Sequence, residues 1–133
     1  MVLAEDHAEF RLGLKEMLAT DGGIEVVGEA ENGAQAVALA REVRPDVIVL
    51  DLLMPVMEGR EALGLILRDV SPPPGIVILT MHDQPHLRRE FMRIGASAFL
   101  AKSASLAEVI GAVKGSRPMR TPREDSGEAP PAS

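Results

Sequence analysis

Five residues could carry chemistry in this sequence, and they stand at the ends of short apolar runs. In chain order they are Glu5, Asp6, Asp51, Thr80 and Lys102. Three carboxylates in one place repel one another unless a cation compensates, and hard divalent ions such as Mg²⁺ take oxygen ligands. A lysine ammonium adds a fixed positive charge, and a threonine hydroxyl can donate to an anionic oxygen. Together these groups fit phosphoryl chemistry, with the Asp51 carboxylate as the nucleophile.

The stretch that leads into Asp51 is the clearest structural signal. Four aliphatic residues at 47–50, bounded by Pro45 and Pro55, predict a strand that is buried on both faces. Asp51 then lies at the carboxyl end of a central strand, where ligands bind in open α/β sheets. Taken alone, Asp51 could equally mark the point where the strand leaves the core, so the rest of the chain has to decide.

The other apolar patterns predict alternating strands and helices. Strands are expected at residues 1–4, 24–28, 47–50, 76–80 and 97–101, and helices at 8–20, 33–44, 59–70, 85–94 and 106–113. Strict alternation with short connections predicts an α/β fold with a doubly wound, five-stranded parallel sheet and five helices. Because parallel strands end at one edge of a sheet, we expect the five polar residues to converge there.

The composition of the 133 residues limits the class of protein. The net charge of −6 argues against non-specific nucleic-acid binding, and the absence of cysteine excludes disulfides, thiolate catalysis and cysteine-based metal sites. With three Phe and no Trp or Tyr, the core is expected to be aliphatic. No apolar run is long enough to span a membrane, and Glu5 and Asp6 interrupt the amino terminus, which argues against a signal peptide. We therefore expect a soluble cytoplasmic protein.

The composition changes at Ser116. Residues 116–133 are rich in proline and contain no aromatic or branched aliphatic residue. Such a segment buries too little apolar surface to offset its ordering entropy. We predict a folded domain over residues 1–115 and a disordered, proline-rich tail over 116–133. A passive extension is favoured over a docking motif for that tail.

Four short motifs occur in a characteristic order. They are Ala-Glu-Asp-His at 4–7, Asp-Leu-Leu-Met-Pro at 51–55 with a glycine at 59, Leu-Thr-Met-His-Asp at 79–83, and the run 95–102 that ends in Lys102. With this set the chain resembles the receiver domain of two-component response regulators over about residues 1–115. The motif around Thr80 is similar to receivers that usually precede a helix-turn-helix DNA-binding domain. The resemblance implies a flavodoxin-like fold with strand order 2-1-3-4-5.

The resemblance also implies a phosphorylation site and a metal site. Asp51 would accept a phosphoryl group from a phosphohistidine on a sensor histidine kinase or a phosphotransfer protein. Glu5 and Asp6 would hold Mg²⁺, directly or through water, together with Asp51 and the backbone carbonyl of Leu53. Such a protein is a phosphoacceptor that assists its own phosphotransfer and dephosphorylation, rather than an enzyme in the usual sense.

Three further residues take part in the switch that the resemblance implies. Lys102 would pair with the Asp51 carboxylate or with the phosphoryl oxygens. Thr80 would move to bond a phosphoryl oxygen, and Phe99 would reorient with it. The change would bias the surface formed by the helix at 85–94, the strand at 97–101 and the last helix.

The function expected from these features is that of a single-domain response regulator. It would signal by binding an unknown downstream protein, or a second copy of itself, through that surface, without direct DNA binding. One alternative is a truncated DNA-binding regulator that lacks its output domain, and another is a pseudo-receiver that docks without taking phosphate. A metal-dependent hydrolase is disfavoured, because Leu53 stands where a general acid would be needed.

The remaining histidines and arginines receive plainer interpretations. His7, His82 and His86 are expected to be loop or helix-start residues rather than metal ligands, since their spacing fits no known ligand pattern. The arginines at 88, 89 and 93 form a basic patch on the helix at 85–94. We interpret this patch as a solvated face, with partner docking as the rival reading.

Overall fold

The computed structural model describes residues 1–117, and five parallel strands form its central sheet in the order β2-β1-β3-β4-β5. The strands are β1 (Val2–Ala4), β2 (Gly28–Ala30), β3 (Val47–Leu50), β4 (Gly75–Thr80) and β5 (Ala98–Ala101). The helices are α1 (Ala8–Leu18), α2 (Gly33–Val43), α3 (Gly59–Asp69), α4 (Pro85–Ile94) and α5 (Leu106–Gly115). The predicted doubly wound fold and its strand order are confirmed.

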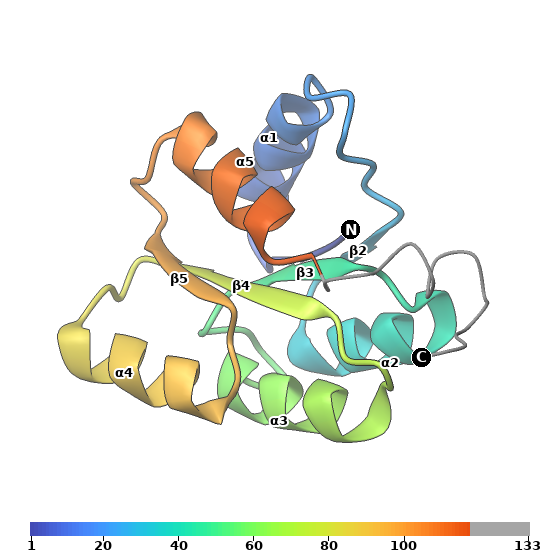
Figure 1. The fold of residues 1–133 in the computed structure, drawn as a ribbon, viewed down its shortest axis with the longest axis vertical. Helices are drawn as coiled ribbons and strands as arrows, with labels where there is room; N and C mark the ends of the chain where they lie inside the picture. Colours follow the sequence, from blue (N-terminus) through green and yellow to red (C-terminus); the bar gives the residue numbers. More distant parts are fainter. Residues whose placement is uncertain (118–133) are drawn as a thin grey trace, which may run out of the picture.

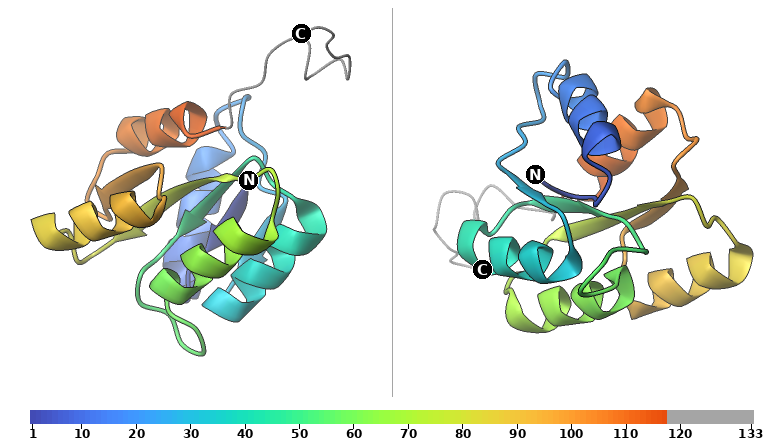
Figure 2. Two further views of the ribbon diagram at one scale, coloured as in Figure 1. Left: turned by 60° about the horizontal axis from the view of Figure 1, so that its bottom comes forward. Right: turned by 180° about the vertical axis from the view of Figure 1, so that it is seen from behind.

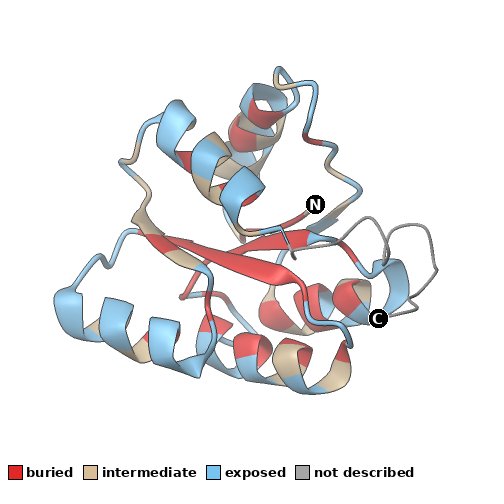
Figure 3. Cartoon of the chain, in the orientation of Figure 1, coloured by how far each residue is buried: buried red, intermediate tan, exposed pale blue. Residues whose placement is uncertain are grey.

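The helices cover both faces of the sheet. Helices α1 and α5 lie on one face, and α2, α3 and α4 lie on the other (Figure 1), an arrangement that the turned views of Figure 2 also show. Every residue of β3 and β4 is buried, as Figure 3 shows in red. Two apolar clusters result, one on each face of the sheet. This burial explains why the two strands read as unbroken aliphatic runs.

The second strand lies later in the chain than predicted. The apolar run at 24–28 was expected to form it, but β2 is Gly28–Ala30. The Val27 N–H donates to the Met1 carbonyl oxygen at 2.9 Å and the Met1 amine donates to the Glu25 carbonyl at 2.8 Å, but the regular pairing of the two strands begins at Val2 and Gly28. A strand needs a partner backbone as well as suitable side chains, and the segment before Gly28 has little partner chain beside it.

The helix ends follow local rules. Pro85 begins α4, and Gly95, at φ 137°, ends it, as the sequence predicted. Ser105 caps α5 in a reciprocal capping box with Glu108. Within residues 1–117, no helix is both long and apolar enough to cross a membrane. The predicted tail, apart from Ser116 and Arg117, lies outside the described residues.

Candidate functional site

The carboxyl edge of the sheet brings the predicted polar residues together. Glu5 directly follows β1, Asp51 follows β3, Thr80 ends β4 and Lys102 follows β5. Glu5, Asp51 and Thr80 are buried, with exposed fractions of 2%, 6% and 0%. They are polar residues buried within an apolar structure, so each needs a partner.

Lys102 is the partner of two carboxylates. Its Nζ lies 2.8 Å from Oε1 of Glu5 and 3.0 Å from Oδ2 of Asp51, and 4.7 Å from the centre of the Phe10 ring. Burial alone would lower the pKa of Lys102, but the two carboxylates outweigh it and raise that pKa. The ammonium therefore stays charged and links the ends of β1, β3 and β5.

The two carboxylates differ in how well they are stabilised. Burial raises the pKa of Glu5, but hydrogen bonds from Lys102 and from the His7 N–H outweigh it, so the pKa lies below its usual range. Burial and the Glu5 charge raise the pKa of Asp51, against the opposing effects of Lys102 and a 2.7 Å bond from the Leu52 N–H. Asp51 is thus the less stabilised anion of the pair, as suits a nucleophile.

The raised pKa of Asp51 makes stability depend on pH. The folded state holds this proton to a higher pH than the unfolded state, so ionisation of Asp51 lowers stability as the pH rises above about 4. In Asp51→Asn this contribution is absent. We expect the variant to gain stability relative to the parent as the pH rises above about 4. Urea unfolding across that range measures it, with Glu61→Gln on the exposed side of α3 as control. A constant or shrinking difference would contradict the prediction.

Asp6 offers an oxygen that fits a cation. Its Oδ1 atom is buried and accepts no hydrogen bond among the described residues. One ligand atom each from Glu5, Asp6 and His7 lie within 4.8 Å of one another, and Nδ1 of His7 is 3.4 Å from Asp6 Oδ1. A buried carboxylate oxygen that accepts no hydrogen bond from the protein suits a hard divalent ion. The acidic residues therefore fit the predicted Mg²⁺ site.

Two glycines fix the loop between β3 and α3. The Gly59 N–H donates to the Leu52 carbonyl at 2.8 Å, and the Gly33 N–H donates to the Met57 carbonyl at 3.1 Å. A Cβ at Gly59 would overlap the backbone oxygen of Asp51, and one at Gly33 would overlap that of Met57. The role of Gly33 was missed from the sequence, where its only signal was the Asn-Gly turn before α2.

The middle of the same loop is strained. Val56 has φ 70° and is 81% exposed, although a β-branched residue rarely adopts this left-handed conformation. Leu53, whose carbonyl is predicted to be a metal ligand, lies in this loop and is half-exposed. The strained turn is held from both ends by the two glycine contacts. Such strain clusters at functional sites.

Two of the three predicted switch residues, Thr80 and Phe99, are buried. The Thr80 hydroxyl oxygen accepts a hydrogen bond from the His82 N–H at 3.0 Å. Phe99 is 2% exposed and packs against Phe91, with ring centroids 6.1 Å apart. Because both side chains have partners, movement of either one requires that an existing contact be given up.

Arg88 has a role that the sequence did not reveal. It was interpreted as part of a solvated basic patch. One of its guanidinium nitrogens donates to the Phe99 carbonyl at 2.7 Å, and another pairs with Asp83 at 2.7 Å. The guanidinium carbon also lies 5.2 Å from the centre of the Phe99 ring. Arg88 therefore ties α4 and the loop before it to β5. Arg89 is exposed and makes no such contact within residues 1–117.

A cavity of about 480 Å³ lies beside the site. His7, Phe10, Thr80, Met81 and Lys102 are among its lining residues. Met81 is 76% exposed at its rim. A small molecule that enters this cavity would reach Thr80 and Lys102.

Comparison with known proteins agrees with this geometry. The family model of the response regulator receiver domain matches residues 1–114. The transcriptional regulatory protein YdfI of Bacillus subtilis is 41% identical over 105 residues, which cover 79% of this chain and 48% of YdfI. The transcriptional regulatory protein LiaR of the same organism is 38% identical over 114 residues, which cover 86% of this chain and 54% of LiaR.

The chain spans about half the length of these curated relatives. Among solved structures, the signal receiver domain of NarL from Mycobacterium tuberculosis matches with a TM-score of 0.78 and 33% identity, over 85% of this chain and 90% of that one. The predicted resemblance, including its similarity to receivers of transcriptional regulators, is confirmed. The chain belongs to the family of response regulator receiver domains of two-component signalling.

Proposed function

We propose that this chain works in the cytoplasm as a single-domain response regulator that is phosphorylated on Asp51. The observation that carries the proposal is the Lys102 ammonium, whose side chain is only 11% exposed and which lies within 3.0 Å of both the Glu5 and Asp51 carboxylates. An ion pair of this kind is costly to bury, and it is useful where negative charge has to accumulate. The donor is a phosphohistidine on a sensor histidine kinase or on a phosphotransfer protein.

The proposed reaction is an in-line transfer. A carboxylate oxygen of Asp51 attacks the phosphorus atom, the phosphorus–nitrogen bond breaks, and the bond electrons leave with the imidazole. Lys102 stays within reach of the new phosphoryl oxygens and offsets their charge. A Mg²⁺ ion held by Glu5, Asp6, Asp51 and the Leu53 carbonyl would neutralise charge on the phosphoryl group.

The proposed signal is a shift in the loop after β4. Phosphorylation adds about −1.5 to −2 charges next to Thr80. The Thr80 hydroxyl then exchanges its bond with the His82 N–H for one to a phosphoryl oxygen. The loop that carries Asp83 follows, and the surface of α4, β5 and α5 is biased toward binding a downstream protein or a second copy of the chain. Coupling in such switches is typically about 1–3 kcal/mol.

Intact-mass measurement tests phosphorylation directly. The chain is incubated with acetyl phosphate and Mg²⁺ beside Asp51→Asn. We expect the mass of one phosphoryl group to be gained by the parent and not by the variant. A parent chain that is folded by circular dichroism and gains nothing would support the pseudo-receiver instead. A gain in both chains would place the phosphoryl group on another residue.

Arg88 provides a test of the switch. Arg88 contacts Phe99 and Asp83. We assign these contacts to the unphosphorylated state, so Arg88→Ala should make rearrangement less costly. We expect Arg88→Ala to bind beryllofluoride with Mg²⁺, a mimic of the phosphoryl group, about fivefold more tightly than the parent, which corresponds to the loss of about one hydrogen bond. Arg89→Ala, the matched control, should bind as the parent does. Equal affinity for the two variants would refute this role for Arg88.

A longer regulator is the second candidate. The curated relatives are transcriptional regulatory proteins about twice as long as the matched region. In that case the same phosphorylation would act on an attached output domain. The size of the native protein, measured by immunoblot of source cells with an antibody against residues 1–117, separates the two: a band near 14.2 kDa supports the single-domain proposal, and a band of about twice that size supports the longer regulator.

A further inference from the structure

The Phe10 ring packs against the Lys102 ammonium on a side that the two carboxylates leave open. Phe10 lies in the first turn of α1. The Nζ atom of Lys102 lies over this ring, 4.7 Å from its centre, and is 2.8 and 3.0 Å from the oxygens of Glu5 and Asp51. An ammonium has three N–H donors, so two carboxylates leave one for the ring. The face of an aromatic ring is the negative part of its quadrupole and attracts a cation.

Each of the three phenylalanines has a cation over its ring, and the Phe10 pair is the closest and the least exposed. The Lys102 side chain is 11% exposed. In the other two pairs the guanidinium carbon lies 5.2 or 5.5 Å from the ring centre and the arginine side chain is 46% or 51% exposed, namely Arg88 over Phe99 and Arg60 over Phe91. A cation–π contact strengthens as the cation loses its water. The Phe10 contact is therefore expected to be the strongest of the three.

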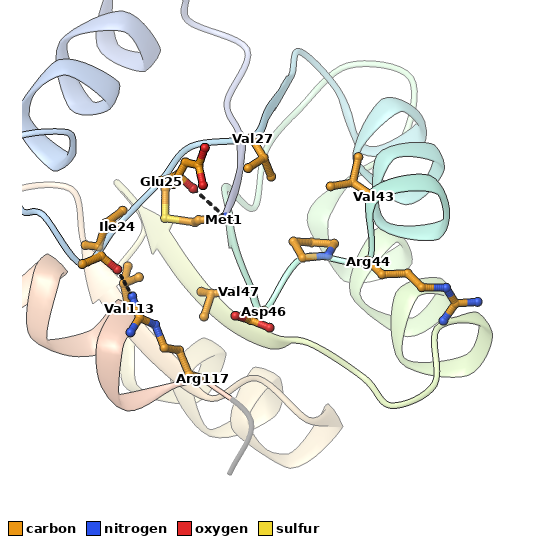
Figure 4. A pocket seen from close by; sticks show the side chains of 12 residues that line it. Met1, Ile24, Glu25, Val27, Val43, Arg44, Asp46, Val47, Val113 and Arg117 are labelled. Carbon is orange, nitrogen blue, oxygen red and sulfur yellow. Dashed lines mark hydrogen bonds between the residues drawn. The ribbon is translucent and has the colours of Figure 1, made fainter. Parts of the chain in front are cut away.

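Phe10 and Lys102 line two cavities, one on each side of their contact. One cavity, of about 480 Å³, extends to Thr80, and the other, of about 280 Å³, is lined by α1 and α5. The groove at the opposite edge of the sheet, which Figure 4 shows between the segments 23–27 and 43–47, shares no lining residue with either. Without the ring, the ammonium would have open space beside it, and its flexible stem could turn toward water.

Phosphorylation would change the carboxylate contacts of Lys102 but not its contact with the ring. When an oxygen of Asp51 bonds to phosphorus, the carboxylate becomes an acyl phosphate and its negative charge moves to the phosphoryl oxygens. The ammonium then has to shift toward these oxygens, and a hydrogen bond weakens steeply as its geometry departs from the ideal. A cation–π contact tolerates such a shift, because it persists within about 6 Å of the ring centre. Phe10 can therefore hold the ammonium before, during and after the transfer.

We propose that Phe10 is a positioning residue for phosphoryl transfer, because its ring face keeps the Lys102 ammonium beside Asp51 while negative charge moves to the phosphoryl oxygens. The role rests on the proposed phosphorylation of Asp51. Phe10 acts through Lys102, since its own side chain has no group that donates to a phosphoryl oxygen. Weakening the ring face should therefore slow phosphorylation while the chain stays folded.

Ring fluorination tests the proposal while leaving the side chain almost the same size. Fluorine withdraws electron density from the ring face, so phenylalanines with one, two or three ring fluorines weaken a cation–π contact step by step. We expect acetyl phosphate with Mg²⁺ to phosphorylate the Phe10 series progressively more slowly, with about a fivefold loss at three fluorines, measured as the rate of mass gain. The same series at Phe91, which lies under the exposed Arg60, is the matched control and should react as the parent does. Equal rates along the Phe10 series, or an equal decline in both series, would overturn the proposal.

Proton NMR of the lysine ammonium groups tests the contact without phosphorylation. The sequence has three lysines, and Lys15 and Lys114 pair with carboxylates at the surface, so these two serve as internal references. A proton over a ring face resonates upfield. We expect the Lys102 ammonium signal to lie upfield of the other two, to move downfield in Phe10→Leu, and to stay upfield in Phe10→Tyr. A Lys102 signal that Phe10→Leu leaves unchanged would overturn the contact and the proposal with it.

Rescue by the conservative variant separates positioning from bulk. Phe10→Tyr keeps the ring and should be phosphorylated at nearly the parent rate, whereas Phe10→Leu should be at least as slow as the chain with three fluorines. A parent that is phosphorylated at a rate independent of the ring would overturn the positioning role alone. A folded parent that takes no phosphoryl group would overturn the proposed function, and the positioning role with it.

Discussion

Replacing Lys102 with methionine is expected to lower the free energy of unfolding by about 3 kcal/mol at neutral pH. The Lys102 side chain is 11% exposed, and its partners on Glu5 and Asp51 are 3% and 8% exposed. Methionine keeps most of the side-chain volume, so the loss comes from charge rather than from a cavity. Two buried carboxylates are left to repel each other without a cation.

Urea unfolding measures this loss, and Lys114→Met is the matched control. Lys114 pairs with Asp21 at 2.9 Å, but its side chain is 44% exposed. A surface pair of this kind is worth less than about 1 kcal/mol. Similar losses for the two variants would show that the Lys102 pairs contribute no more than surface pairs.

The electrostatic explanation also predicts how the stability deficit of Lys102→Met changes with pH. In the parent, the raised pKa of Lys102 means that its stabilisation is fully present at neutral pH and is lost only as the pH rises through that pKa. In the variant, protonation of Asp51 and Glu5 removes the unpaired charges. The deficit should therefore shrink as the pH falls toward about 4. A deficit that grows on acidification would contradict the electrostatic explanation.

Replacing Gly59 with alanine is expected to cost about 2–3 kcal/mol of stability and to slow phosphorylation roughly tenfold. The new Cβ would overlap the Asp51 carbonyl oxygen and would lie 2.9 Å from the Leu52 Cα. Both neighbours are backbone, so no side-chain rotation relieves the overlap. The overlap is relieved only when α3 and the backbone at Asp51 move apart. This movement displaces the Asp51 carboxylate.

Gly64→Ala is the control in the same helix. Nothing lies within 4 Å of a Cβ built at Gly64, and the residue is in the middle of α3. Alanine there should raise stability by about 0.5–1 kcal/mol, because glycine is a poor helix former. Thermal unfolding and the rate of mass gain with acetyl phosphate measure both variants. If Gly59→Ala stabilised the chain as Gly64→Ala does, the close approach to Asp51 would be excluded.

The carboxyl-edge cluster could be predicted from the sequence because topology alone requires it. The runs that became β3 and β4 are continuously apolar, and only a strand covered on both faces buries such a run. Once the strands are parallel, residues that directly follow them share one edge. The sequence therefore predicts that Asp51, Thr80 and Lys102 lie close together.

The extent of β2 and the role of Arg88 could not be predicted in this way. Val26 and Val27 suit a strand, but where the ladder runs depends on how far β1 reaches, which is a property of another segment. The guanidinium of Arg88 contacts Phe99, and the two residues belong to different elements. In the sequence, a helix arginine that contacts another element cannot be distinguished from one that faces solvent.

The sequence by itself determined the alternation of elements, the sheet order through its family resemblance, and the identity of the residues at the carboxyl edge. These depend on local periodicity and on the direction of the chain. Only the tertiary structure decided that Lys102 bridges Glu5 and Asp51, that Asp6 keeps an unbonded oxygen, and that Gly59 lies against Asp51. Each of these depends on distances of a few ångströms between segments far apart in the chain, and packing rather than local preference sets those distances.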